Sequence, residues 1–367
     1  MSVRSILNTF NQLFLICGLG CIKYNQSNLN TTMMFYIWRC TIICCGFKTF
    51  YDANCYWATR FDNDIFDITS FVMICFYETI YIGRILSNVW RLFLDNKLSV
   101  VLIRLEGIHD KLIRLNVVRP MKVKMHWLLS FGILVHFIAF NMRTMYWIII
   151  QLRFPNMIIL TPIAGLISNI CACVAFYEYM LLISYIKWMV YIINEQIPKN
   201  ISTISTFRDL YLEVMECLND INISIYGLPA IVSYIGANVG VIFVLLFYKV
   251  IFAENYEVRD VGLVTIEIVT ITIRTISIIL LYGIGHATEK EINRMSLVLQ
   301  QRSIIERNPR IKRQIKFFIL RNCHEQFHFK LYGILEINPT QLLILSNKAF
   351  AYLVIQILFK LNKNKNQ

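Results

Sequence analysis

The stretch IILTPIAGLISNICACVAFYEYMLLISYIKWMV, residues 158–190, decides the fold class of this chain. It contains one acid, Glu178, and one base, Lys187, among residues that are otherwise mostly apolar. A helix needs about 20 mostly apolar residues to cross a bilayer, so this run is long enough to span one and to continue beyond it. We expect a membrane-spanning helix whose C-terminal part extends into the cytoplasm.

Further apolar runs of spanning length lie on both sides of this stretch. Hydrophobic residues make up 57% of the 367 residues and charged residues only 16%, whereas an ordinary globular domain is about 25% charged. The sequence therefore predicts an all-α fold: a single seven-helix membrane domain over residues 1–367. The predicted spans are about 33–51, 65–86, 126–151, 158–190, 229–252, 262–286 and 341–360.

The orientation of these spans follows from the basic residues in the connections between them. Lys and Arg number eight in 87–125 and ten in 287–340, and few occur in the connections on the opposite side. Because cytoplasmic loops carry an excess of Lys and Arg, we predict cytosolic loops at 87–125, 191–228 and 287–340. The N-terminus is then cytoplasmic and the C-terminus extracellular, which is the inverse of a G-protein-coupled receptor. Loops that face an anionic leaflet also explain the net charge of +13 without a nucleic-acid partner.

The C-terminal stretch FKLYGILEINPTQLLILSNKAFAYLVIQILF, residues 329–359, carries the most specific pattern in the chain. It resembles the C-terminal signature of insect gustatory receptors, in which a G-L-F-x-L/I-N/D entry precedes a helix that ends in T-Y-hhhhh-Q-F. The match has two departures, since Ala351 stands at the threonine position and Leu358 at the glutamine position. Gln356 lies two residues away, which is about 200° around a helix. Asn338–Pro339 is typical of a helix start.

This resemblance implies a function and an assembly. Insect gustatory receptors are ligand-gated, non-selective cation channels of the plasma membrane of chemosensory neurons, in dendrite and axon. They assemble as homo- or hetero-tetramers, with the seventh helices around the pore and cytosolic helix extensions as the main subunit contact. The implied ligand is a small-molecule tastant, such as a bitter compound, and membrane lipid surrounds the chain. The implied pore and gate residues are Tyr352, Gln356, Leu358 and Phe359.

Polar and aromatic residues within the predicted bundle are candidates for the ligand pocket. Aromatic walls with a few polar groups suit a small organic ligand, although the same residue types also join helices to one another. Glu267 and Arg274 lie seven residues apart on the sixth span, too far for direct pairing, so they meet other helices or line a wet cavity. The ligand-binding candidates are Asn141, Tyr146, Trp147, Thr161, Ser168, Asn169, Glu267 and Arg274.

Three other functions remain as alternatives. An odorant receptor of the same superfamily is the nearest, and a G-protein-coupled receptor conflicts with the predicted orientation. The third is a membrane zinc protease, because His324-Glu325-Gln326-Phe327-His328 is a formal HExxH motif. No Asp, Glu or His follows Glu336 to provide a third ligand downstream. We therefore expect no catalytic residue, no metal and no cofactor.

Overall fold

The computed structural model describes residues 11–12, 15, 21, 29–61, 68–115, 138, 160–199, 204–226, 261–323, 327–331, 333 and 335–365. Within these ranges almost every residue is helical. The elements are α2 (Leu29–Phe61), α3 (Ile68–Arg114), α5 (Leu160–Gln196), α6 (Ile204–Asn219), the π-helical turn η2 (Asp220–Ile225), α9 (Val261–Ile305), α10 (Pro309–Cys323), β1 (Lys330–Leu331), β2 (Leu335–Glu336) and α11 (Pro339–Lys365).

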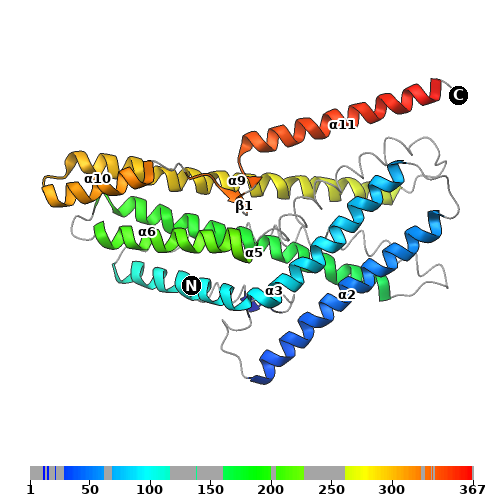
Figure 1. Ribbon diagram of the computed structural model, residues 1–367, viewed down its shortest axis with the longest axis horizontal. Coiled ribbons are helices and arrows are strands. Elements are labelled where there is room, and N and C mark those ends of the chain that lie inside the picture. Colours follow the sequence, from blue (N-terminus) through cyan, green and yellow to red (C-terminus); the bar gives the residue numbers. More distant parts are fainter. Residues whose placement is uncertain are drawn as a thin grey trace.

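The long helices divide the molecule into a bundle and a splayed region (Figure 1). The bundle consists of α6, α10 and the C-terminal parts of α3, α5 and α9, and these helices run side by side. At the other end α2 and the first part of α3 cross the direction of α5 obliquely, and α11 diverges from α9. The two-residue strands β1 and β2 pair antiparallel between α10 and α11.

The three connections predicted as cytosolic loops are largely helical in the described residues, and their cytosolic location stays a prediction. α3 continues from its predicted span to Arg114, and α9 continues to Ile305 before α10 begins. The connection after α5 contains α6 and η2. Most charged residues in these segments, such as Lys97, Arg104 and Glu216, alternate with apolar ones at helical spacing and lie on the exposed face of amphipathic helices. Hydropathy detects the loss of continuous apolarity and not the end of a helix.

The amphipathic pattern is clearest in α6. Its buried residues include Phe207, Leu210, Val214 and Leu218, spaced three or four apart along one face. α10 uses the same spacing, with Ile315 and Phe318 buried. The two helices contribute these faces to one continuous core with α3, α5 and α9.

The C-terminal part of α5 is the centre of this core. Among the described residues, Phe176–Gln196 is the one helical segment that is long and apolar enough to cross a bilayer, and 83% of its most apolar window is buried inside the molecule. Other helices bury this segment, and its extension beyond the bilayer stays a prediction. The predicted spans 126–151 and 229–252 lie outside the described residues, apart from residue 138.

Candidate functional site

The helix α11 corresponds to the seventh predicted span, and it starts where the sequence predicts. Asn338 Oδ1 accepts a hydrogen bond from the backbone N–H of Gln341 at 2.7 Å, which is the geometry of an N-cap. Pro339 occupies the first helical position, where its missing N–H leaves no bond unmade. The prediction that Asn338–Pro339 begins a helix is confirmed.

One face of α11 is exposed along most of the helix. The side chains of Leu343, Val354 and Leu358 are 62%, 37% and 59% exposed, and Asn347 and Ala351 between them are exposed as well. These positions recur every three or four residues, so they share one side of the helix, which we call the α11 stripe. Among the described elements α9 is the main neighbour of α11, and Figure 1 shows α11 leaving α9 toward its C-terminal end. The stripe therefore has no cover within this part of the chain.

The four predicted pore residues do not all lie on this stripe. Tyr352, Gln356 and Phe359 fall within about 60° of one another around the helix and about 100° or more from Leu358. The side chain of Leu358 is described and exposed, whereas those of the other three lie outside the described set. Either Leu358 or the other three can point at a central axis. The pore role of all four stays a prediction.

The predicted ligand-binding residues also fall outside what the structure describes. Asn141, Tyr146 and Trp147 belong to a range that is not described. Thr161, Ser168 and Asn169 are on α5, and Glu267 and Arg274 are on α9, with side chains outside the described set. Their role in ligand binding stays a prediction.

The HExxH motif does not form a zinc site in the described residues. α10 ends at Cys323, and Phe327 and His328 are not helical, so the described part of the motif lacks the helix that would place two imidazoles on one face. Instead His328 Nδ1 lies 3.6 Å from Glu289 Oε1 on α9. Within the described ranges, no group of three His, Cys, Asp or Glu side chains is placed to hold a metal ion.

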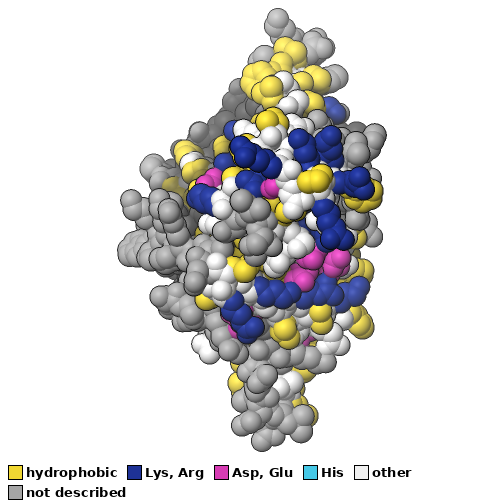
Figure 2. All heavy atoms as spheres, turned by 90° about the vertical axis from the view of Figure 1, so that its left-hand side faces the viewer, with side chains coloured by type: hydrophobic (Ala, Val, Ile, Leu, Met, Phe, Trp, Pro, Cys, Tyr) yellow, Lys and Arg dark blue, Asp and Glu magenta, His cyan; other side chains and the backbone are white. Residues whose placement is uncertain are grey.

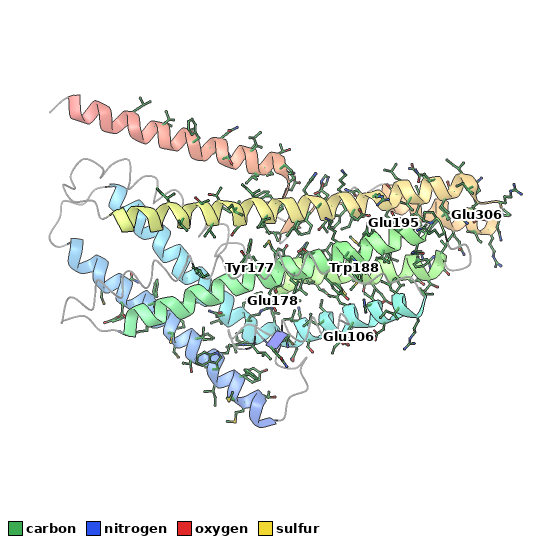
Figure 3. All side chains as sticks on the ribbon, turned by 180° about the vertical axis from the view of Figure 1, so that it is seen from behind. Glu106, Tyr177, Glu178, Trp188, Glu195 and Glu306 are labelled. Atoms are coloured by element: carbon green, nitrogen blue, oxygen red, sulfur yellow. The ribbon has the colours of Figure 1, made fainter. Side chains whose placement is uncertain are left out.

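A buried group of charged and phenolic side chains joins three elements between the bundle and the splayed region. Glu178 on α5 accepts a hydrogen bond from Arg91 on α3, and the two side chains are each 5% exposed. Arg91 Nη2 also lies 3.1 Å from the hydroxyl of Tyr226, which follows η2. Tyr179 is next to Glu178 and donates to the amide oxygen of Asn222 on η2 at 2.9 Å. Figure 3 shows Glu178 and Tyr177 on α5 in the middle of the molecule, far from Glu306.

A second buried ion pair extends this group to α2. Both terminal nitrogens of Arg39 lie 3.3 Å from Asp95 Oδ1, and these two side chains are 2% and 3% exposed. Asp95 is one helical turn beyond Arg91, so α3 presents a base and an acid on the same face. The pairs Arg39–Asp95 and Arg91–Glu178 carry no net charge together, which limits the cost of burying them. We call these four residues the junction cluster.

The sequence contained a partial signal for the junction cluster. Glu178 stands alone as an acid inside an apolar run and therefore requires a partner on another helix. Arg39 interrupts the first predicted span in the same way. Arg91 and Asp95 gave no such signal, because they lie in a segment interpreted as a solvated loop. Their burial depends on α3 continuing through that segment.

The end of the bundle farthest from the splayed region is strongly basic. Arg310, Arg313 and Lys316 on α10 and Arg307 before it are exposed. Figure 2, which views this end of the molecule, shows Lys and Arg side chains gathered over it around a smaller group of Asp and Glu. Lys111 Nζ and Glu213 Oε1, 2.9 Å apart, form one of the ion pairs on this part of the surface.

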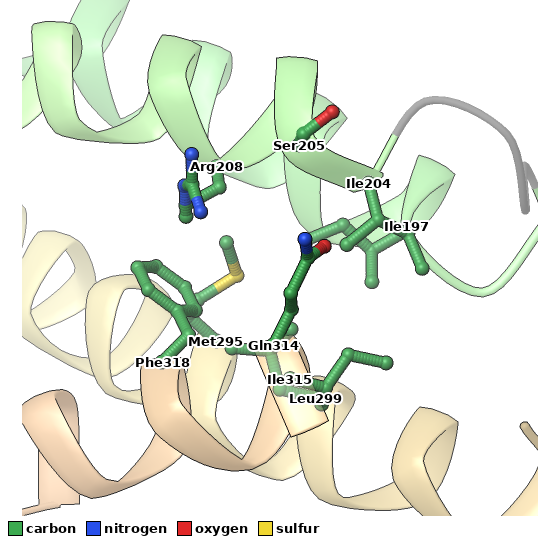
Figure 4. Close-up of a pocket in the computed structure, with 9 residues that line it drawn as sticks. All are labelled: Ile197, Ile204, Ser205, Arg208, Met295, Leu299, Gln314, Ile315 and Phe318. Carbon is green, nitrogen blue, oxygen red and sulfur yellow. The ribbon is translucent and has the colours of Figure 1, made fainter. Parts of the chain in front are cut away.

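A small cleft opens between the start of α6, α9 and α10 near this basic end (Figure 4). Its walls are apolar, and Ser205, Arg208 and Gln314 provide the polar groups. Arg208 is already engaged, because its Nε donates to Asp209 Oδ1 at 3.0 Å. The remaining lining residues are Ile197, Ile204, Met295, Leu299, Ile315 and Phe318. The cleft offers little beyond the packing of three helices.

His109 is buried within the bundle, and we therefore expect the stability of the folded protein to depend on pH. Its ring centroid lies 5.9 Å from that of Trp188 and 6.5 Å from that of Tyr185, and its Nε2 has no hydrogen-bond partner among the described residues. Burial lowers the pKa of His109 below its ordinary value of 6.5, although Asp110 and Glu106 oppose the shift. The unfolded chain therefore binds the proton more readily, and stability present above pH 6.5 is lost as the pH falls through and below that value.

We expect the melting temperature of the detergent-solubilised protein to decrease when the pH is lowered from about 7.5 to about 5.5. In His109→Phe this decrease should be smaller, because the titrating group is gone. Thermal unfolding at the two pH values measures both effects. His286→Phe on α9 provides the matched control, because it removes a histidine whose side chain is exposed and not buried. An equal fall in the wild type and in His109→Phe would show that His109 is not the group responsible.

Residues 7–363 match the family model described as 7tm Chemosensory receptor. Because the match covers nearly the whole chain, the protein belongs to the 7tm chemosensory receptor family. The comparison with curated proteins returned no match.

Solved structures of insect receptors share the fold. The olfactory receptor OR5 from Machilis hrabei is similar with a TM-score of 0.75 at 10% identity, over 96% of this chain and 97% of that one. The same receptor in complex with eugenol has a TM-score of 0.69 at 11% identity, over 97% and 98%. These findings confirm the all-α seven-helix membrane fold and the membership of a chemosensory receptor family. The chain is a multi-pass membrane receptor and not an enzyme.

Proposed function

We propose that this protein is a gustatory-type receptor: a tetrameric, ligand-gated, non-selective cation channel of the plasma membrane that opens to a small organic tastant, such as a bitter compound. The family and the fold support a chemosensory receptor. The observation that carries the channel proposal is the α11 stripe, a long exposed face on the last helix. In a tetramer the four stripes face a shared axis and need no cover from their own subunit.

The bundle supports the proposed assembly through a second set of exposed apolar side chains. Isolated apolar residues on a surface are common, but large ones that cluster indicate a contact. Ile304 and Ile305 at the end of α9 are 80% and 68% exposed, and Phe317 on α10 is 73% exposed. Leu297, two turns earlier on α9, is 59% exposed. These residues suit a contact between the cytosolic bundles of neighbouring subunits. The basic side chains at the end of each bundle then lie at the rim of that contact.

The gustatory assignment rests on the C-terminal sequence. Gly333, with a φ of +71°, forms the turn between β1 and β2, and the residues Leu335–Asn338 that follow lead into α11. This is the segment that resembles the gustatory signature. Olfactory detection is the second candidate, because the solved structures that share the fold are those of an olfactory receptor, one of them with eugenol bound. A panel that contains both water-soluble tastants and volatile odorants separates the two.

Whole-cell recording from cells that express this chain alone tests the proposal. We expect a tastant-evoked current carried by both Na⁺ and K⁺ that persists when G-protein signalling is blocked. Untransfected cells provide the control. A response that disappears under G-protein blockade contradicts the channel mechanism. A current evoked only by volatile odorants assigns the receptor to the olfactory group instead.

A further inference from the structure

Residues 327–338 connect the bundle to α11, and we call the described part of this segment (327–331, 333 and 335–338) the strap. It folds back on itself through the paired strands β1 and β2, with Lys330 opposite Glu336. The backbone N–H of Ile337 closes the base of this hairpin by donating to the carbonyl of Phe329 at 2.9 Å. The strap is therefore a short closed unit and not a slack linker. Figure 1 shows it beside α9, at the point where α11 begins.

Three residues on one face of α9 hold the strap. Asn293 donates from Nδ2 to the carbonyl of Phe327 and accepts from its N–H, both at 3.0 Å. Glu289 Oε2 accepts a hydrogen bond from the N–H of Phe329 at 3.0 Å. Gly285 is the third residue, one further turn back along α9. Residues 285, 289 and 293 are spaced four apart, so they form one continuous seat on the helix.

The contact at Gly285 leaves no free space. A Cβ placed there would lie 2.6 Å from Ile337 Cγ2, 3.2 Å from Ile337 Cβ and 3.3 Å from Phe329 Cδ1. Ile337 is fully buried and β-branched, so its methyl group is fixed close to the backbone and cannot swing away. An added carbon at Gly285 therefore forces the strap and α9 to shift relative to each other.

The strap is joined directly to the first turn of α11, so a displacement of the strap also displaces the start of that helix. Ile337 immediately precedes Asn338, the N-cap of the helix, and Asn338 Nδ2 also donates to Glu336 Oε2 at 3.3 Å. Leu342, the first apolar residue inside the helix, packs against the same core as Ile337, which is the arrangement of a hydrophobic staple. The strap, the N-cap and the first turn of α11 are thus one body that rests on the seat.

We propose that Gly285, Glu289 and Asn293 are positioning residues for channel opening: through the strap they couple the position of α9 to that of α11. This inference rests on the proposed channel function and adds the element that transmits movement to the pore helix. The same three contacts transmit a shift of α9 along its axis to the start of α11. Channel opening and the fit of the strap on α9 are therefore linked.

Gly285→Ala tests this coupling, and Gly283→Ala is its matched control. Both changes add one methyl group to the same helix, but a Cβ at Gly283 meets nothing within 4 Å. We expect Gly285→Ala to shift the tastant concentration for half-maximal current by about 2- to 30-fold, the range found for coupling residues distant from a ligand. Gly283→Ala should leave it unchanged. In an Ile337→Ala background, which removes Cγ2, Gly285→Ala should have little further effect, because the clashing methyl is gone.

A second pair of variants, both at Glu289, distinguishes loss of the strap contact from general misfolding. Glu289→Gln keeps an acceptor oxygen for the Phe329 N–H and should behave like the wild type, whereas Glu289→Ala should shift the current like Gly285→Ala. Size-exclusion chromatography and surface labelling check that each variant assembles and reaches the membrane. Assembled variants in which Gly285→Ala equals Gly283→Ala, and Glu289→Ala equals Glu289→Gln, overturn the proposal.

A thiol-modification experiment decides the same question without a tastant. Leu358→Cys places a thiol on the α11 stripe, and its rate of reaction with a membrane-impermeant maleimide applied from outside reports the position of α11. We expect Gly285→Ala to change this rate and Gly283→Ala not to, with the chain lacking the introduced thiol as the blank. A wild-type chain that conducts no current under any tastant, either alone or coexpressed with other receptor subunits, refutes the proposed function, while these rates still decide the coupling. Equal maleimide reaction rates in Gly285→Ala and Gly283→Ala overturn the proposed coupling between α9 and α11.

Discussion

Replacing Glu178 by alanine is expected to destabilise the folded protein by about 3–5 kcal/mol, because it leaves the buried guanidinium of Arg91 without its carboxylate. Arg91 is 4% exposed, so water cannot take the place of the missing group. The hydroxyl of Tyr226 remains within 3.1 Å of Arg91 Nη2 but carries no compensating charge. Thermal unfolding of the purified protein and the yield of monodisperse tetramer measure the effect.

Glu195→Ala is the matched control for this change. Glu195 is also on α5 and also pairs with an arginine, with Arg294 Nη2 at 2.9 Å from its Oε1. Those side chains are 36% and 42% exposed, so losing the pair should cost less than about 1 kcal/mol. Figure 3 shows the two glutamates at different levels of the same helix. A double change, Arg91→Met with Glu178→Leu, should recover much of the lost stability because no unpaired buried charge remains at this position. If Glu178→Ala is as stable as Glu195→Ala, the junction cluster does not hold the helices together.

Replacing Leu358 by serine is expected to raise the current in the absence of ligand severalfold. In the proposed tetramer four Leu358 side chains form an apolar ring near the outer end of the pore, and such a constriction stays closed by excluding water. Serine wets the ring and lowers the barrier to ions. Basal whole-cell current, normalised to the amount of receptor on the cell surface, measures the change.

Gln356→Ala shows which face of α11 lines the pore. Gln356 lies about 160° around the helix from Leu358, so both cannot face the axis. With the α11 stripe toward the axis, Gln356→Ala leaves basal current unchanged. If Gln356→Ala alters the relative permeability to Na⁺ and K⁺ and Leu358→Ser has no effect, then the opposite face, with Tyr352 and Phe359, lines the pore.

The sequence predicted the class of fold well because a bilayer imposes a simple length rule. The run at 158–190, the start of a helix at Asn338–Pro339 and the insect-receptor pattern that follows it were all readable from residue types. Helices continue beyond the predicted spans because amphipathic segments are stable once another helix covers their apolar face. That cover is a property of the tertiary structure, so α6 and the extensions of α3 and α9 were interpreted as loops.

The contacts that hold the functional parts together were harder to predict. Glu178 was recognisable as an acid that needs a partner, but its partner Arg91 lies 87 residues away in a segment that looked solvated. Gly285 gave no signal, since a glycine in an apolar run fits many roles. Its importance comes from Ile337, whose position depends on the turn at Gly333 and on the hydrogen bonds to Glu289 and Asn293. Such pairings arise from a particular packing and not from a periodic pattern.

The orientation in the membrane is the claim on which the channel proposal depends most. It places the basic bundle in the cytosol, the strap at the inner face of the bilayer and the end of α11 outside. Epitope tags fused ahead of Met1 and after Gln367, detected by antibody on intact and on permeabilised cells, measure it directly. We expect the C-terminal tag to be stained on intact cells and the N-terminal tag only after permeabilisation. Staining of the N-terminal tag on intact cells would contradict the inverted topology and, with it, the proposed channel.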